Sequence, residues 1–109
     1  MIISIGKAKI QVKVCDTVLK QARGLMFSSP KNLLFIFDQE AYHGLHMFCV
    51  FFAIDVVFLD KDKKVVEIKE DFRPFTIYNP KKKAQYIIEM PQGSAKKYKV
   101  RIGTKISFN

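Results

Sequence analysis

The sequence predicts a mainly β fold: a compact, curled or barrel-like sheet, mostly antiparallel, with one short helix near the N-terminus. Short runs rich in β-branched and aromatic residues recur along the whole chain, as is typical of strands. One longer stretch, in the first third, shows helical spacing. About eight short strands in one domain do not fit a flat open sheet, so we expect the sheet to curl or close on itself.

Two patterns mark the expected strands. Residues 10–14 and 64–69 alternate apolar and polar side chains, which indicates strands with one buried face. Residues 33–37 are apolar on both faces, which is typical of a strand covered on both sides. In chain order, the expected strands are residues 2–5, 10–14, 33–37, 47–52, 54–59, 64–69, 73–78, 86–90 and 105–108.

Helices and turns are expected between these strands. Asp16 and Thr17 can accept the orphan backbone amides of a helix start, and the apolar spacing behind them predicts a helix over residues 17–23. The short polar side chains in residues 60–63 can bond their own backbone, which favours a hairpin turn. We also expect a one-turn helix at residues 94–97.

Composition limits the class of protein. Apolar residues make up 49% of the 109 residues and charged residues 27%, which excludes a disordered chain. No linker or repeat interrupts the pattern, so we expect residues 1–109 to form a single domain. Two cysteines cannot build a disulfide framework, and we find neither a signal-peptide pattern nor an apolar stretch long enough to span a bilayer. We therefore expect a cytoplasmic protein with reduced thiols.

The net charge of +9 is concentrated in the second half of the chain. Residues 1–55 carry a net charge of +2, and residues 56–109 carry +7. From residue 77 onward, eight basic side chains stand against Glu89 alone. Such an asymmetry predicts an anionic partner and leaves open whether that partner is a small ligand, a protein or a nucleic acid.

Four motifs occur along the chain in a characteristic order. They are Arg-Gly-Leu-Met at residues 23–26, Leu-Phe-Ile-Phe at 34–37, the segment from His-Met-Phe at 46–48 to Ile-Asp-Val-Val-Phe-Leu-Asp at 54–60, and Tyr-Ile-Ile-Glu-Met-Pro-Gln-Gly at 86–93. Together, across residues 10–106, they resemble domain-of-unknown-function family 192, small β-rich proteins of bacteria and archaea. The resemblance implies a compact β fold and brings no established reaction, substrate or cofactor.

One motif departs from the family pattern. Where many members have Trp-Met-Lys-Asn-Thr, residues 46–50 read His-Met-Phe-Cys-Val, so a catalytic signature in that stretch would be mostly absent here. The glycines are isolated and form no phosphate-binding loop. We therefore expect a small binding or accessory domain with no identifiable catalytic activity and no cofactor.

Asp55 is the main candidate for a ligand-binding residue. Its carboxylate interrupts an apolar run, and an unpartnered buried charge is costly. One interpretation places it in a cleft between its strand and the helix end at Arg23, where it would contact a ligand. The other interpretation is structural, with Asp55 accepting backbone amides or pairing with Arg23. His46 and Glu89 complete the candidate ligand-binding set.

A catalytic alternative uses the same side chains. Asp55, Glu89 and His46 would serve as the acid/base or metal-binding groups of a hydrolase if the fold brought them together. A separate metal site at His43, His46 and Cys49 is disfavoured, because on a strand these side chains do not share one face. We therefore expect no metal.

A further alternative is sequence-tolerant nucleic-acid binding. Lysine-rich runs in the C-terminal third lie beside Tyr78, Tyr86 and Tyr98, and cations beside aromatic rings can hold single strands. This alternative is much weaker if the runs lie on opposite sides of the molecule. The residues proposed for this role are Lys81, Lys82, Lys83, Lys96, Lys97, Lys99 and Arg101.

Overall fold

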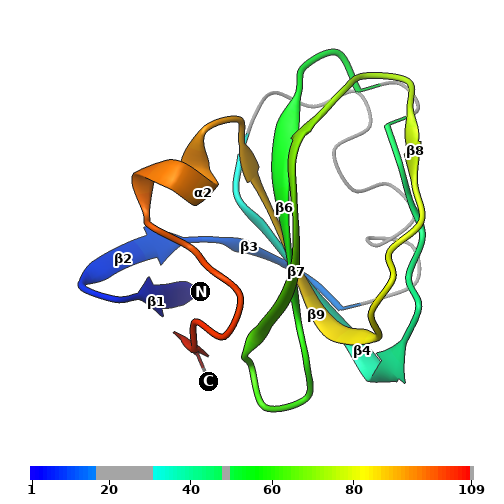
Figure 1. The fold of residues 1–109 in the computed structure, drawn as a ribbon. Coiled ribbons are helices and arrows are strands. Elements are labelled where there is room, and N and C mark those ends of the chain that lie inside the picture. The colour runs from blue at the N-terminus through cyan, green and yellow to red at the C-terminus, as the bar shows by residue number, and fades with distance from the viewer. Residues whose placement is uncertain (17–30, 48–49, 109) are drawn as a thin grey trace.

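The computed structural model describes residues 1–16, 31–47 and 50–108, which form three β-sheets and a short helix (Figure 1). The elements are β1 (Ile2–Ile5), β2 (Ala8–Gln11), β3 (Lys13–Cys15), β4 (Leu33–Ala41), β5 (Leu45–His46), β6 (Ile54–Leu59), β7 (Val65–Phe72), β8 (Ile77–Tyr78), β9 (Ala84–Pro91), α2 (Ser94–Lys97) and β10 (Ile106–Ser107). The predicted mainly β and mostly antiparallel character is confirmed. Within the described ranges, no helix is long and apolar enough to cross a membrane.

The central sheet has five strands in the order β3-β4-β9-β6-β7. Neighbouring strands are antiparallel except β3 and β4, which run parallel. All six residues of β6 are buried, because β6 lies inside the sheet and both faces of the sheet are covered. A strand covered on both faces needs a nearly continuous apolar sequence, which explains the composition of Ile54–Leu59.

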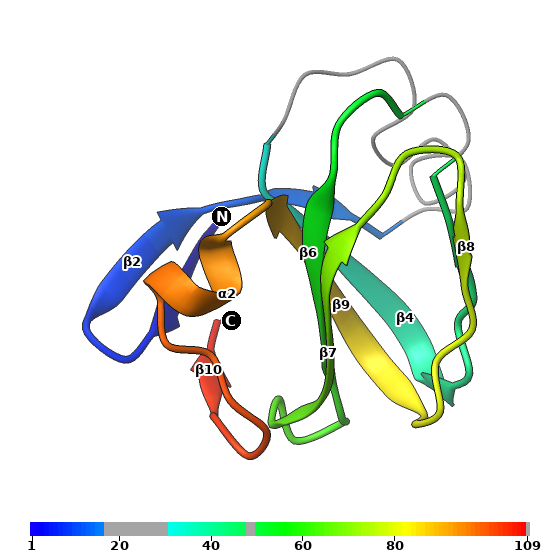
Figure 2. The same ribbon diagram turned by 45° about the horizontal axis from the view of Figure 1, so that its top comes forward.

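A different layer covers each face of the central sheet. The three-stranded sheet β10-β1-β2 and α2 pack on one face, where Ile3, Ile5 and Ala95 join a first core cluster. The two-stranded ribbon β5-β8 and the chain around it cover the other face, where Met47 and Tyr78 pack in a second cluster. Figures 1 and 2 show α2 and β8 on opposite sides of β6 and β7. Alternate residues of β6 and β9 therefore point into different cores.

The barrel-like closure expected from the number of strands is wrong for the described part of the chain. β3 and β7 are the two edges of the central sheet and do not pair with each other. Closing a sheet is one way to bury its apolar face, and covering each face with a separate layer is another. The second solution applies here, because the two core clusters bury the two faces separately.

Several predicted elements agree closely with the structure. The strand over 54–59 and the one-turn helix at Ser94–Lys97 are confirmed. β4 begins where predicted and extends further, to Ala41. The expected helix over residues 17–23 lies outside the described residues, and the helix that the structure describes lies towards the C-terminus.

The apolar run over residues 47–52 is not a strand where the structure describes it. Met47 and Val50 instead fill the second cluster from a loop, and both are buried. Strand and buried loop both require apolar side chains at such positions, so composition alone could not separate them.

Candidate functional site

Asp55 has 1% of its surface exposed and lies in β6, on the sheet face that α2 covers. Its Oδ2 accepts hydrogen bonds from the backbone amides of Gly93 and Ala95, both at 3.0 Å. Its Oδ1 accepts a hydrogen bond from the amide of Asp71 at 3.1 Å. Because Gly93 precedes α2 and has no side chain to cap it, Asp55 supplies the missing acceptor. These contacts match the structural interpretation of Asp55.

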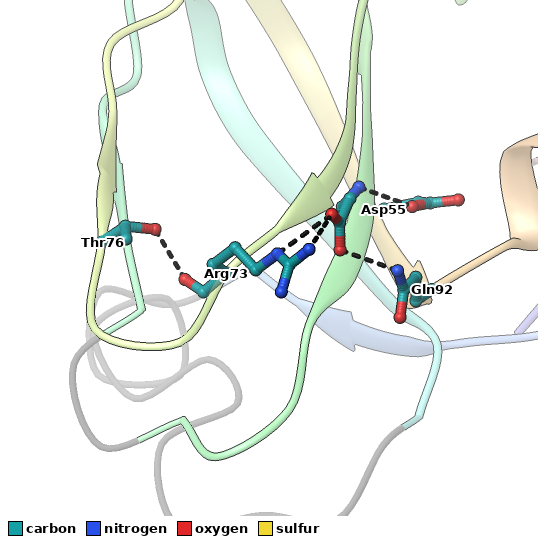
Figure 3. Close-up of polar contacts among 5 residues, drawn as sticks. Asp55, Arg73, Thr76 and Gln92 are labelled. Atoms are coloured by element: carbon teal, nitrogen blue, oxygen red, sulfur yellow. Dashed lines mark hydrogen bonds and ion pairs between the residues drawn. The ribbon is translucent and has the colours of Figure 1, made fainter.

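A further set of polar contacts surrounds Asp55 (Figure 3). Asp71, near the end of β7, has a left-handed backbone with φ 52°. Its Oδ1 accepts a hydrogen bond from Gln92 Nε2 at 2.7 Å. Its Oδ2 accepts one from Arg73 Nε at 3.0 Å and pairs with Arg73 Nη2 at 2.8 Å. The start of β6, the end of β7 and the turn before α2 are thereby connected at one corner of the fold.

The loop between β7 and β8 is held by backbone contacts as well. Thr76 Oγ1 donates a hydrogen bond to the carbonyl of Arg73 at 2.6 Å (Figure 3). The amide of Phe75 donates to the carbonyl of Met47, and the amide of Met47 donates to the carbonyl of Thr76, both at 2.8 Å. The position of Phe75 is therefore set by the backbone on both sides of it.

This loop contributes to an apolar surface that no sequence motif marked. Phe51, Phe75 and Ile77, which we name the apolar ridge, have 66%, 57% and 75% of their surface exposed. The rings of Phe51 and Phe75 pack edge to face, with centroids 5.4 Å apart and planes at 71°. Phe75 has φ 58°, a left-handed conformation that costs a residue with a side chain about 1–2 kcal/mol. The structure thus holds a strained phenylalanine in contact with solvent.

Glu89 is a second buried carboxyl group, with 7% of its surface exposed. It lies in β9 between Leu33 of β4 and Val56 of β6, on the sheet face opposite to that of Asp55. Within residues 1–16, 31–47 and 50–108, its carboxyl group has neither a hydrogen bond nor an ion pair. Desolvation by burial raises the pKa of Glu89 to about 7. The folded protein therefore contains a group that titrates near neutral pH beside its second core cluster.

The structure does not bring the three hydrolase candidates together. Asp55 and Glu89 point to opposite faces of the central sheet, and backbone amides engage both oxygens of Asp55. His46 is exposed in β5, opposite Ile77 of β8. Arg23, the remaining ligand-binding candidate, lies outside the described residues. Asp55, Glu89 and His46 therefore form no acid/base constellation.

The described residues also contain no group of three or more His, Cys, Asp or Glu side chains that could hold a metal ion. His43 stacks on Phe37 with ring centroids 3.6 Å apart, and its Nε2 is buried without a hydrogen-bond partner. Desolvation by burial lowers the pKa of His43, which favours the neutral ring. Cys49, the last residue of the motif considered for metal, lies outside the described residues.

The two lysine-rich runs lie on opposite sides of the central sheet (Figures 1 and 2). Residues 96–101 lie in and after α2, which packs on the first cluster. Residues 81–83 follow β8, which covers the second cluster. A single nucleic-acid strand lying on one face therefore cannot contact both runs, and the proposed seven-residue interface is not continuous.

Glu67 fixes the backbone of the lysine-rich run at residues 81–83. Its Oε1 accepts hydrogen bonds from the amides of Lys81 and Lys82, both at 2.9 Å, and its Oε2 accepts one from the Tyr78 hydroxyl. Burial, together with this carboxylate, raises the pKa of Tyr78 to about 12. The tyrosine beside the lysines is thus turned inward and engaged, while the three lysine side chains at 81–83 are exposed.

Comparison with known proteins finds relatives of uncharacterised function. The DUF192 family model, described as Uncharacterized ACR, matches residues 1–108. A UPF0127 protein from Pyrococcus abyssi is 40% identical over 101 residues, which cover 90% of this chain and 86% of the relative. A UPF0127 protein from Thermococcus kodakarensis is 41% identical over an alignment of 115 positions, which covers 99% of this chain and 73% of the relative.

A solved structure shares the fold. A protein of unknown function from Novosphingobium aromaticivorans superposes with a TM-score of 0.89, covering 98% of this chain and 84% of that one. The two sequences are 19% identical, so the likeness concerns the arrangement of the chain and carries no function with it.

Proposed function

This chain belongs to the DUF192 family, and from that premise we propose that it is a small binding domain, not an enzyme, which engages its partner through the apolar ridge. The observation that carries the proposal is the exposure of Phe51 and Phe75, whose rings are in contact, and of Ile77, two residues after Phe75 in the chain. Large exposed apolar patches on soluble domains usually mark interaction sites. Burying the ridge against a partner would remove three large side chains from water.

The backbone of Phe75 supports the same proposal. A bulky residue with positive φ is rare and persists only where the surrounding structure enforces it. Folding alone gains little from this arrangement, because the ring remains mostly exposed and a glycine would remove the strain. Strain that orients an exposed aromatic ring is typical of a binding site.

Asp55 is a positioning residue in this proposal. It holds the amide of Asp71, and Asp71 in turn holds the Arg73 side chain at the start of the loop that carries Phe75. In this proposal His46, the cross-strand neighbour of Ile77, contacts the partner directly. We also assign the protein to the cytoplasm, because a chain with two cysteines has no disulfide framework to maintain.

A photocrosslinking amino acid at the ridge tests the proposal. The reactive residue p-benzoylphenylalanine replaces Ile77 in one variant and Ile102 in the control variant. Ile102 is 65% exposed and lies between α2 and β10, away from the ridge. Irradiation of cells should give a discrete adduct from position 77 that is missing from position 102.

The adduct is then verified with purified components. The partner found at position 77 should bind the wild-type protein at least about tenfold more tightly than it binds Phe75→Ser. The same adducts from both positions, or equal affinity for the wild type and Phe75→Ser, would refute a binding role for the ridge.

A further inference from the structure

We propose that the partner of the apolar ridge is an anionic phospholipid surface, which the ridge enters and which Lys81, Lys82 and Lys83 hold electrostatically. We name these three lysines the lysine loop. The inference rests on the function proposed above and specifies the chemistry of the partner. Lysine and arginine side chains next to exposed apolar ones are the combination that binds the interface of anionic membranes.

The ridge and the lysine loop lie on one side of the molecule. Ile77 begins β8, and only Asn79 and Pro80 separate β8 from the lysine loop. Both ribbon views place β8 at the outer edge of the fold, on the side away from α2 (Figures 1 and 2). The β5-β8 ribbon therefore has apolar side chains at one end and cations just beyond the other.

The cations of the lysine loop are available to an anionic surface. All three side chains are exposed, and among the described residues none of them forms an ion pair. The Glu67 carboxylate accepts hydrogen bonds from the backbone amides of Lys81 and Lys82 and does not engage their ammonium groups. Lys83 Nζ lies 5.8 Å from the centroid of the exposed Tyr42 ring, an aromatic group suited to the headgroup region.

The shape of the ridge favours lipid over stacked nucleic-acid bases. Ile77, the most exposed of the three, is aliphatic and offers no ring on which a base could stack. Phe51 and Phe75 meet at 71°, so they do not form a flat platform for successive bases. Tyr78 packs against the second cluster and donates its hydroxyl hydrogen to Glu67. Insertion into the hydrocarbon of a bilayer, unlike base stacking, does not require the rings to be parallel.

Charge and composition favour lipid over a protein surface. Two copies of this chain, each with a net charge of +9, would bring like-charged lysine loops together. Lysine is depleted from the centres of protein–protein interfaces, whereas lysine beside phenylalanine and aliphatic residues is common where proteins lie in a bilayer interface. An anionic bilayer can bury the apolar ridge and attract the lysine loop at the same time.

Sedimentation with large vesicles tests the inference on the whole chain. Vesicles of phosphatidylglycerol provide an anionic surface, and vesicles of phosphatidylcholine provide a neutral one. The wild-type protein should sediment with the anionic vesicles and much less with the neutral ones. Added salt should weaken the binding, because it screens the attraction between the lysines and the headgroups.

Matched variants separate the parts of the surface. The ridge variant is Phe51→Ser, Phe75→Ser and Ile77→Ser, with Ile102→Ser as its control. The lysine variant is Lys81→Gln, Lys82→Gln and Lys83→Gln, with Lys96→Gln, Lys97→Gln and Lys99→Gln as a control of equal charge on the opposite side. Ile77→Ser alone replaces the ridge variant if circular dichroism shows that the triple substitution prevents folding.

The partition coefficient onto phosphatidylglycerol vesicles should fall at least about tenfold in the ridge variant and about fivefold per lysine in the lysine variant. Both controls should stay much closer to the wild type. Absence of wild-type binding would overturn the lipid inference, yet a verified protein adduct at position 77 would still support the ridge as a binding site. Equal losses in the lysine variant and its control would also overturn the inference, because net charge would then explain the binding. Unchanged binding by the ridge variant would exclude insertion.

Discussion

Replacing Glu89 by Gln should stabilise the protein at neutral and alkaline pH and leave its stability almost unchanged in acid. The two side chains have nearly the same shape, but the amide never ionises. In the folded wild-type protein, burial raises the pKa of Glu89 from 4.5 to about 7. Between these values the unfolded chain has released a proton that the folded chain still holds.

The magnitude follows from the difference between the two pKa values. One unit corresponds to about 1.4 kcal/mol, so a rise from 4.5 to about 7 amounts to about 3 kcal/mol. Because the folded-state pKa is the higher one, this contribution is fully present below pH 4.5 and is lost as the pH rises through about 7. Above that pH the free energy of unfolding stays lower by this constant amount. Solvent screens the effect little, since only 7% of Glu89 is exposed.

Urea unfolding followed by circular dichroism measures the effect. Free energies of unfolding for the wild type and Glu89→Gln should agree near pH 4.5 and differ by about 3 kcal/mol near pH ~8, with equal m-values. Glu70→Gln removes an exposed carboxylate from the same sheet and should follow the wild-type curve. If Glu89→Gln is no more stable than the wild type near pH ~8, the reasoning is refuted, because a compensated charge must then exist at Glu89.

Substitutions at two further positions test the corner around Asp55 and the loop beyond it. Asp55→Ala leaves one buried and two part-buried amides without an acceptor and should lower the free energy of unfolding by about 3 kcal/mol, with a smaller loss for Asp55→Asn. Urea titration measures both losses, and a wild-type value for Asp55→Ala would contradict the capping role. Phe75→Gly should be more stable than Phe75→Ala by about 1 kcal/mol, because φ is positive there. A more stable alanine variant in the same assay would argue against strain.

Local sequence patterns were sufficient for those elements whose burial is uniform. β6 is apolar at every position except Asp55 because both faces are covered, and the match to Ile54–Leu59 follows directly. Sheet closure could not be predicted in this way. Whether β7 pairs with β3 or stays an edge depends on which distant segments cover the sheet, and the same apolar strands are compatible with both outcomes.

The candidate site was predictable only in part. Asp55 was predictable as a buried acid that needs partners, because it interrupts an apolar run, but two of its amide donors lie 38 and 40 residues further along the chain. Glu89 lies in a strand that could have faced solvent, and its burial depends on the layer covering that face.

The apolar ridge could not be predicted from residue types. Phe51 belongs to a run typical of a buried strand, and its exposure follows from the chain leaving the sheet there. Phe75 is exposed through a left-handed conformation that phenylalanine does not favour. The pattern over residues 73–78 predicts a strand, whereas only Ile77–Tyr78 forms one, so the turn that exposes Phe75 had no counterpart in the sequence pattern.

The side chains of β6 alternate between two cores, and this alternation determines which substitutions can compensate one another. Val56 packs in the second cluster and its neighbour Val57 in the first, where Ile88 lies opposite it. A change of volume at Val57 can be compensated by Ile88, thirty-one residues away, more readily than by the adjacent Val56. The central sheet thus divides the interior into two compartments, so a change of volume in one core can be compensated within that core without a change in the other.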